Sequence, residues 1–172
     1  MTRILNVVGC KNSGKTRTIE LLVPVLHDLD LQVGTLKHTQ HDGFNWDVKG
    51  KDTYRHYEAG SIITGIFGNS SFAFNLNRDG LVSPCVDDLV RVFYRDLDLV
   101  IIEGLKSDPG LKVEVCRPDY SDREVVPASE ILATFGVSLF NRDVSHFDYG
   151  HERELGQHIA NNLNRLRTVD SE

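Results

Sequence analysis

Short apolar runs alternate along the chain with stretches in which apolar residues recur every three or four positions. The run at residues 4–8 predicts a strand, and the helical spacing that begins at Thr16 predicts a helix. The apolar face of that helix would consist of Ile19, Leu22, Val23, Leu26 and Leu29. The same patterns predict further strands over 31–38, 61–67, 71–76, 97–104, 112–116 and 130–135, and further helices over 52–59, 86–96 and 151–166. Strands that alternate with helices predict an α/β fold, with a mostly parallel, doubly wound sheet flanked by helices.

The predicted strand at residues 4–8 runs directly into GCKNSGKT at residues 9–16, a complete G-x-x-x-x-G-K-[ST] motif. A glycine-rich turn between a strand and a helix offers backbone N–H groups and the positive end of a helix dipole to a phosphate chain. Lys15 then reaches the β- and γ-phosphates, and the Thr16 hydroxyl ligates Mg²⁺. The alternative is a plain glycine turn, and the strand–loop–helix context argues against it. The motif predicts a P-loop NTPase fold that binds a nucleoside triphosphate.

An acidic residue ends the most apolar of the predicted strands. Four apolar residues, 99–102, precede Glu103, a pattern typical of a buried parallel strand whose carboxyl end points at a site. Because the carboxyl ends of neighbouring parallel strands line one crevice, Glu103 is expected close to residues 9–16. Its carboxylate is expected to hold Mg²⁺, directly or through water, or to orient an attacking water. The alternative is a surface acid at a strand end.

The segment from Lys37 to Asp52 is rich in charged side chains. In P-loop proteins, segments at this position order around the γ-phosphate and Mg²⁺ and act as switches. Asp42 and Asp52 are candidates for positioning water or metal, and Lys37 and Lys51 for contacting an anionic ligand. The alternative is a solvated loop without chemistry.

Histidines in and near this segment leave a further interpretation open. His38 and His41, with His56 nearby in sequence, form a candidate divalent-metal site, although no cysteine accompanies them. Arg55 suits bidentate contact with a phosphate or a carboxylate. Lys106 is a further candidate anion contact at the mouth of the crevice.

Composition and charge narrow the class of protein. The 172 residues include 19 Lys and Arg against 25 Asp and Glu, a net charge of −6, which argues against nucleic acid as a partner. No apolar stretch approaches the roughly 20 residues of a membrane span, and the N-terminus shows no signal-peptide pattern. Cys10, Cys85 and Cys116 lack C-x-x-C spacing, as expected for reduced thiols. We therefore expect a cytoplasmic protein with one domain, residues 1–172, and no nucleic-acid or membrane partner.

Four segments together resemble the MobB family of molybdopterin-guanine dinucleotide biosynthesis adaptor proteins. They are GCKNSGKT at 9–16, VGTLKHTQHD at 33–42, GKDTYRHYEAGS at 50–61 and LDLVIIEGLK at 97–106. The first motif is common to P-loop proteins. The Lys-His-Thr run, and the Gly-Lys-Asp ahead of Arg-His and Ala-Gly, are much more particular to this family.

The resemblance implies a small dimeric GTP-binding protein with weak hydrolysis. It would work beside MobA, the guanylyltransferase that attaches GMP to molybdopterin. By matching motif, the residues that hold the phosphates and Mg²⁺ are Gly9, Lys11, Asn12, Ser13, Gly14, Lys15 and Thr16. Glu103 would be the Walker-B acid, acting with Lys15 and Asp42. The residues that face the nucleotide or the pterin phosphate would be His38, His41, Asp42, Lys51 and Asp52. The cofactors implied are GTP and Mg²⁺, with molybdopterin as a further ligand.

The sequence contains no motif that would select guanine as the base of the bound nucleotide. An N-K-x-D motif is missing, and residues 77–79 and 141–143 are too compressed to replace it, so guanine rests on the resemblance. Two other function classes remain open. The histidines would suit a metal-insertion GTPase. A small-molecule kinase would hold its acceptor near Asp42 and Asp52, although the sequence shows no Arg/Lys-rich lid.

Overall fold

The computed structural model of the chain describes residues 1–39, 47–76 and 84–170. The described residues form two compact units: unit 1 contains residues 1–39 and 86–170, and unit 2 contains residues 47–76 with 84–85. The single domain expected over residues 1–172 stays a prediction.

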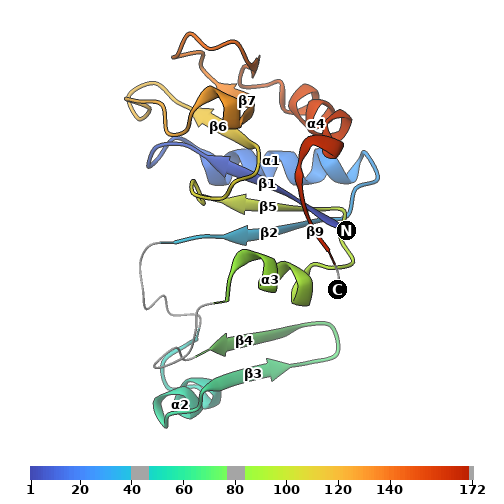
Figure 1. Ribbon diagram of the computed structural model, residues 1–172. Helices are drawn as coiled ribbons and strands as arrows, with labels where there is room; N and C mark the ends of the chain where they lie inside the picture. Colours follow the sequence, from blue (N-terminus) through green and yellow to red (C-terminus); the bar gives the residue numbers. More distant parts are fainter. Residues whose placement is uncertain (40–46, 77–83, 171–172) are drawn as a thin grey trace. The chain divides into compact units, whose positions relative to one another are not determined.

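Unit 1 is built on a seven-stranded sheet in the order β2-β5-β1-β6-β7-β8, with β9 paired to β1 (Figure 1). Its strands are β1 (Thr2–Val8), β2 (Val33–Lys37), β5 (Leu99–Glu103), β6 (Lys112–Cys116), β7 (Ile131–Gly136), β8 (Ser145–Phe147) and β9 (Arg167–Val169). Every pair along the main path is parallel, and β9 runs antiparallel to β1. The mostly parallel sheet predicted from the sequence is therefore confirmed.

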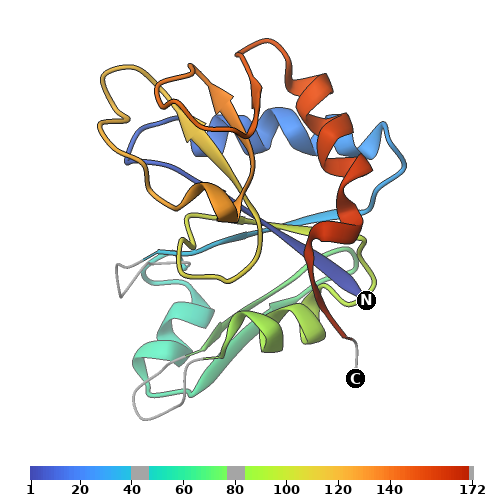
Figure 2. The same cartoon turned by 45° about the horizontal axis from the view of Figure 1, so that its top comes forward.

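Helices cover both faces of this sheet, because the strands carry apolar side chains on each face. Leu5 and Val7 belong to a core shared with α1 (Lys15–His27) and α4 (Glu152–Asn161), which lie side by side (Figure 2). Ile4 belongs to a second core that includes Val90 of α3 (Val86–Phe93). Strands that are buried on both faces consist of nearly continuous apolar residues, which is the pattern seen in the sequence. The doubly wound arrangement is thus also confirmed.

Unit 2 contains α2 (Asp52–Glu58) and an antiparallel hairpin of β3 (Ile63–Phe67) and β4 (Phe72–Leu76). The N-cap of α2 is Lys51, which makes no side-chain capping hydrogen bond. Asp52 is the first helical residue of α2, as the predicted range 52–59 had it. A carboxylate there interacts favourably with the positive end of the helix dipole.

The last predicted helix is shorter than expected. It was expected over 151–166, but α4 ends at Asn161, and a 3₁₀ turn at Leu163–Arg165 leads into β9. Asn162 explains the stop, since its side-chain Nδ2 donates to the backbone oxygen of His158, 2.8 Å away. None of the described helices is both long and apolar enough to cross a membrane.

Candidate functional site

The loop between β1 and α1 has a backbone that only glycine allows at one position. Gly9 adopts φ +152, and a Cβ there would lie 2.5 Å from Ser13 Oγ and 2.6 Å from the backbone oxygen of Val115. Gly14, with φ +101, is the N-cap of α1. The loop therefore turns tightly over the carboxyl end of β1. At its opening, the first turn of α1 presents backbone N–H groups that have no partner within the helix.

Lys15 lies across this loop. Its Nζ donates to the backbone oxygens of Cys10, at 2.7 Å, and Gly9, at 3.3 Å. Burial lowers the pKa of Lys15, the carboxylate of Glu103 opposes that shift, and the charges of Lys106 and Lys37 add to it. Three ammonium groups close enough to influence one another create a positive potential that suits a polyphosphate.

Glu103 joins three elements at the carboxyl edge of the sheet. Its Oε1 accepts hydrogen bonds from Thr16 Oγ1, at 3.0 Å, and from Lys37 Nζ, at 3.1 Å. The strand register explains the meeting, since Glu103 lies opposite Val7 of β1 on one side and Lys37 of β2 on the other. The expected proximity of Glu103 to the loop is confirmed, and its side chain is only 13% exposed.

A groove of about 470 Å³ starts at these three side chains. Thr16, Lys37 and Glu103 form its polar end. Its remaining wall is mostly apolar and includes Ile19 and Val23 of α1. The polar end offers a hydroxyl and a carboxylate oxygen, the ligand types that Mg²⁺ prefers, beside an ammonium group that suits a phosphate.

The remaining residues singled out from the sequence lie in several places. His38 follows β2, and its backbone N–H donates to the oxygen of Glu103 at 3.0 Å. Ser13 is fully buried, whereas Lys11 is exposed at the loop tip. Lys51 and Asp52 belong to unit 2.

Two candidates cannot be placed against these residues. Asp42 and His41 lie outside the described residues. Within the described ranges, no three His, Cys, Asp or Glu side chains gather as a metal site.

Sequence reasoning missed a contact on the other side of the loop. The Cys10 thiol donates weakly to Asp122 Oδ1, at 3.6 Å, and to the backbone oxygen of Arg123, at 3.8 Å. The charged loop after β6 therefore borders the phosphate-loop motif. No local sequence signal links Cys10 to a residue more than a hundred positions away.

A buried polar network was also missed. Asp108 accepts hydrogen bonds from Asn6 Nδ2, at 2.8 Å, and from the guanidinium of Arg167, with Nη2 at 2.6 Å. Arg167 Nη1 also donates to Asp87 Oδ1 at 2.7 Å. The one available signal was Asn6, a polar residue inside an apolar strand, which must find a partner when buried.

The family model for molybdopterin guanine dinucleotide synthesis protein B (MobB) matches residues 4–136. The chain belongs to the MobB family. The molybdopterin-guanine dinucleotide biosynthesis adapter protein of Haemophilus influenzae is 34% identical over 117 residues, which are 67% of this chain and 64% of that protein. A probable adapter protein of the same description from Bacillus subtilis is 33% identical over 135 residues, 76% of this chain and 73% of that protein.

Solved MobB structures share the fold. The structure of Bacillus subtilis MobB superposes with a TM-score of 0.68 at 25% identity, covering 96% of this chain and 98% of that one. A MobB homologue from Bacillus stearothermophilus gives a TM-score of 0.64 at 21% identity, covering 94% and 97%. The P-loop NTPase-like fold of the MobB family is therefore the fold of this chain.

Proposed function

We propose that this MobB-family chain binds GTP and acts as an adaptor in the biosynthesis of molybdopterin guanine dinucleotide. It would assist the guanylyltransferase that attaches GMP to molybdopterin. The observation that carries the proposal is the contact of Thr16 and Lys37 with Glu103, beside a loop that carries Lys15. Relatives of this chain are described as molybdopterin-guanine dinucleotide biosynthesis adapter proteins.

The triphosphate would lie along the loop, with its terminal phosphates toward Lys15 and Lys37. Backbone N–H groups at the start of α1 would donate to phosphate oxygens, and the positive end of the helix dipole would favour the negative charge of the phosphates. Thr16 and Glu103 would hold Mg²⁺, which neutralises phosphate charge when bound. The Lys15 ammonium, now on backbone oxygens, would exchange these for stronger charge-assisted bonds to phosphate.

The same contacts fit slow hydrolysis. A general base must be free to accept a proton from water within hydrogen-bond reach. In the proposed complex Glu103 would instead hold Mg²⁺, and its Oε1 already accepts hydrogen bonds from Thr16 and Lys37. We propose that the nucleotide serves mainly to set the binding state of the protein and that turnover is weak.

The test is a calorimetric comparison of Mg-GTP and Mg-ATP binding to the full chain. We expect tighter binding of Mg-GTP, and loss of binding in Lys15→Ala, because removing the ammonium leaves phosphate charge uncompensated. Arg95→Ala is the matched control, because it removes an exposed cation at the end of β5 opposite Glu103. Equal binding to wild type and Lys15→Ala would contradict the nucleotide site.

A second assay tests the adaptor role. Formation of the guanine dinucleotide by a MobA-like guanylyltransferase is followed with and without this chain. We expect wild type to raise product formation and Lys15→Ala to raise it less. No difference between the presence and absence of the chain would refute the adaptor role while leaving nucleotide binding intact.

We further propose that the chain works as a homodimer, as its family resemblance implies. The hairpin of unit 2 supports this, because Phe67 is 88% exposed, Phe72 64% and Ile66 60%. A two-stranded hairpin is marginally stable by itself, and exposed apolar clusters commonly mark protein interfaces. A second copy would cover these side chains.

A further inference from the structure

The carboxylate expected to hold Mg²⁺ already has a cationic partner in unit 1. Lys37 Nζ donates to Glu103 Oε1 at 3.1 Å, and Thr16 Oγ1 donates to the same oxygen at 3.0 Å. The strand register brings the charged pair together, because Lys37 of β2 lies opposite Glu103 of β5. One carboxylate oxygen thus serves a hydroxyl and an ammonium group where a ligand to Mg²⁺ is expected.

The two charged partners differ in exposure, and this difference decides which of them can leave. The side chain of Glu103 is 13% exposed, whereas that of Lys37 is 65% exposed. The main chain is fixed at this point, since the N–H of His38 donates to the backbone oxygen of Glu103 at 3.0 Å. An exposed ammonium on a flexible stem exchanges a carboxylate for water at small cost. Lys37 can therefore leave Glu103 by rotation of its side chain alone.

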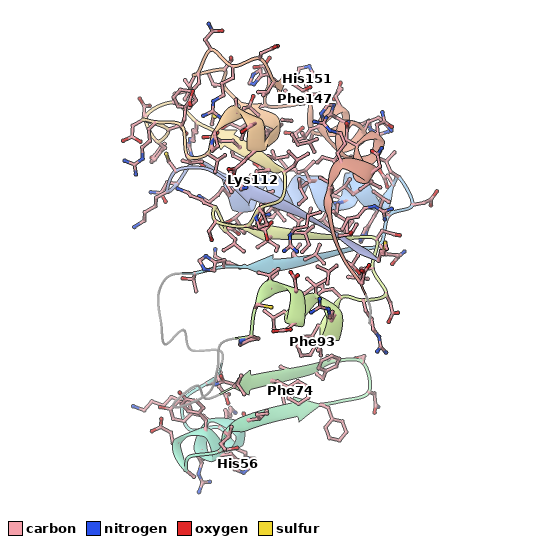
Figure 3. The ribbon with its side chains drawn as sticks, viewed as in Figure 1. His56, Phe74, Phe93, Lys112, Phe147 and His151 are labelled. Carbon is pink, nitrogen blue, oxygen red and sulfur yellow. The ribbon has the colours of Figure 1, made fainter. Side chains whose placement is uncertain are left out.

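A second lysine of unit 1 shows how a permanent ion pair is built in this fold. Figure 3 labels Lys112 of β6, whose side chain is fully buried. Its Nζ donates to the backbone oxygens of Asp108, at 2.7 Å, and Gly110, at 2.8 Å, and to Glu130 Oε2 at 2.7 Å. These acceptors use all three N–H groups of the ammonium, which fixes it in place. Lys37, by contrast, is exposed and lies where a metal ion would compete with it.

We propose that the Lys37 ammonium competes with Mg²⁺ for Glu103 and replaces the metal as counter-charge when Mg²⁺ is absent, an inference that rests on the proposed function. Two cations on one carboxylate oxygen repel each other, so Lys37 leaves Glu103 when Mg²⁺ enters. Without Mg²⁺, the ammonium keeps the charge of Glu103 from repelling the triphosphate. Nucleotide affinity therefore depends less on Mg²⁺ than it would if Glu103 had no cationic partner. By linkage, bound nucleotide raises Mg²⁺ affinity by the same reduced factor.

Calorimetry measures this competition as a ratio, the dissociation constant of GTP in EDTA divided by that in saturating Mg²⁺. Lys37→Met keeps the length of the side chain and removes its charge. We expect it to raise the ratio about fivefold, the equivalent of one exposed ion pair. Loss of a contact between Lys37 and a phosphate would lower both affinities equally and cancel in the ratio. Lys37→Arg keeps the cation and should keep the wild-type ratio.

Lys106→Met is the matched control for a change in local charge. The charge of Lys106, like that of Lys37, lowers the pKa of Lys15, so both ammonium groups act on the same site. The hydrogen bond to Glu103, however, comes from Lys37. We therefore expect Lys106→Met to lower nucleotide affinity by a similar factor in EDTA and in Mg²⁺, and to leave the ratio unchanged.

A second measurement uses the metal alone. Mn²⁺, whose electron paramagnetic resonance signal reports the free ion, is titrated into the nucleotide-free chain, and we expect tighter binding by Lys37→Met than by wild type. Equal ratios in wild type and Lys37→Met, or equal Mn²⁺ binding by the two, would overturn the inference. Absence of GTP binding in both conditions would refute the proposed function instead, and the Mn²⁺ titration would then decide the inference by itself.

Discussion

Gly9 carries the tightest steric constraint at the phosphate-loop motif. Gly9→Ala would place a methyl group 2.5 Å from Ser13 Oγ and 2.6 Å from a backbone oxygen. Because the backbone neighbour cannot give way cheaply, we expect about 1–3 kcal/mol of destabilisation and at least tenfold weaker Mg-GTP binding. Thermal unfolding and calorimetry measure the two effects.

A second glycine supplies the control for this prediction. Gly150 also has positive φ, at +91, but nothing lies within 4 Å of a Cβ added there. Gly150→Ala therefore carries the backbone strain without the clash. Equal losses of nucleotide affinity in both variants would show that the steric argument at Gly9 is wrong.

We expect Lys15 to make the proposed nucleotide affinity depend on pH in one direction. Burial lowers its pKa from the ordinary value of 10.5, and Glu103 only partly opposes that effect. The ammonium that attracts phosphate is thus lost at a lower pH than in an ordinary lysine. We expect Mg-GTP affinity to fall from neutral to alkaline pH.

Lys15→Arg isolates this effect, since a guanidinium stays charged throughout. Guanine itself titrates identically in both measurements, so the difference between the two pH profiles reports Lys15. Parallel profiles would contradict the assignment.

At the scale of elements, β9 is held by a polar network as well as by its pairing with β1. Arg167 of β9 binds Asp87 of α3 and Asp108 in the loop before β6, where the Asp108 side chain is 3% exposed. We expect Asp108→Asn to lower the free energy of unfolding by about 3 kcal/mol, because Arg167 loses its buried counter-charge. Chemical denaturation measures this loss.

The stabilisation that Asp108 provides is expected to depend on pH in one direction. Burial alone raises the pKa of Asp108, but hydrogen bonds from Arg167, the Gly110 N–H and Asn6 together lower it below its usual value. The stabilisation is therefore present above the pKa of the unfolded state and disappears as the pH falls through the folded-state pKa. Asp108→Asn should therefore reduce the loss of unfolding free energy on acidification. Asp28→Asn, which removes a carboxylate from an exposed pair with Arg153, should leave that loss unchanged.

The elements that the sequence predicted are those whose own residues determine them. The apolar run of β5 and the helical spacing of α1 can be recognised from the residues of these segments alone, because the pattern of apolar positions reflects which side chains are buried. The strands β8 and β9 have only three residues each, with mixed polarity, so their pairing depends on distant partners. The site follows the same division. The meeting of Thr16 with Glu103 follows from parallel-strand order, whereas the partners of Cys10 and Asp108 depend on the packing of the whole sheet.

At the scale of the whole molecule, oligomeric state is the property to test. We expect the wild-type chain to sediment as a dimer at micromolar concentration, and Phe67→Ser with Phe72→Ser to shift it toward monomer. Both substitutions remove apolar area that a partner would cover, at about 25 cal/mol per Å². Sedimentation velocity with Val92→Ser, a 64% exposed residue of α3, provides the control.

The contradicting results are equally definite. A wild-type chain that stays monomeric at every concentration would refute the dimer. A dimer that survives the double substitution would place its interface away from the hairpin.

One edge of β1 is shared by two strands that are about fifty residues apart in sequence, β6 (Lys112–Cys116) and β9 (Arg167–Val169). Thr2 to Ile4 face β9, and Asn6 to Val8 face β6. On a ribosome, β1 therefore emerges before either of these neighbours and gains β9 only when residues 167–169 emerge. At usual synthesis speeds that interval is on the order of ten seconds. Throughout it, the amino end of this β1 edge lacks its strand partner, so the protection of that edge comes late in the synthesis of each molecule.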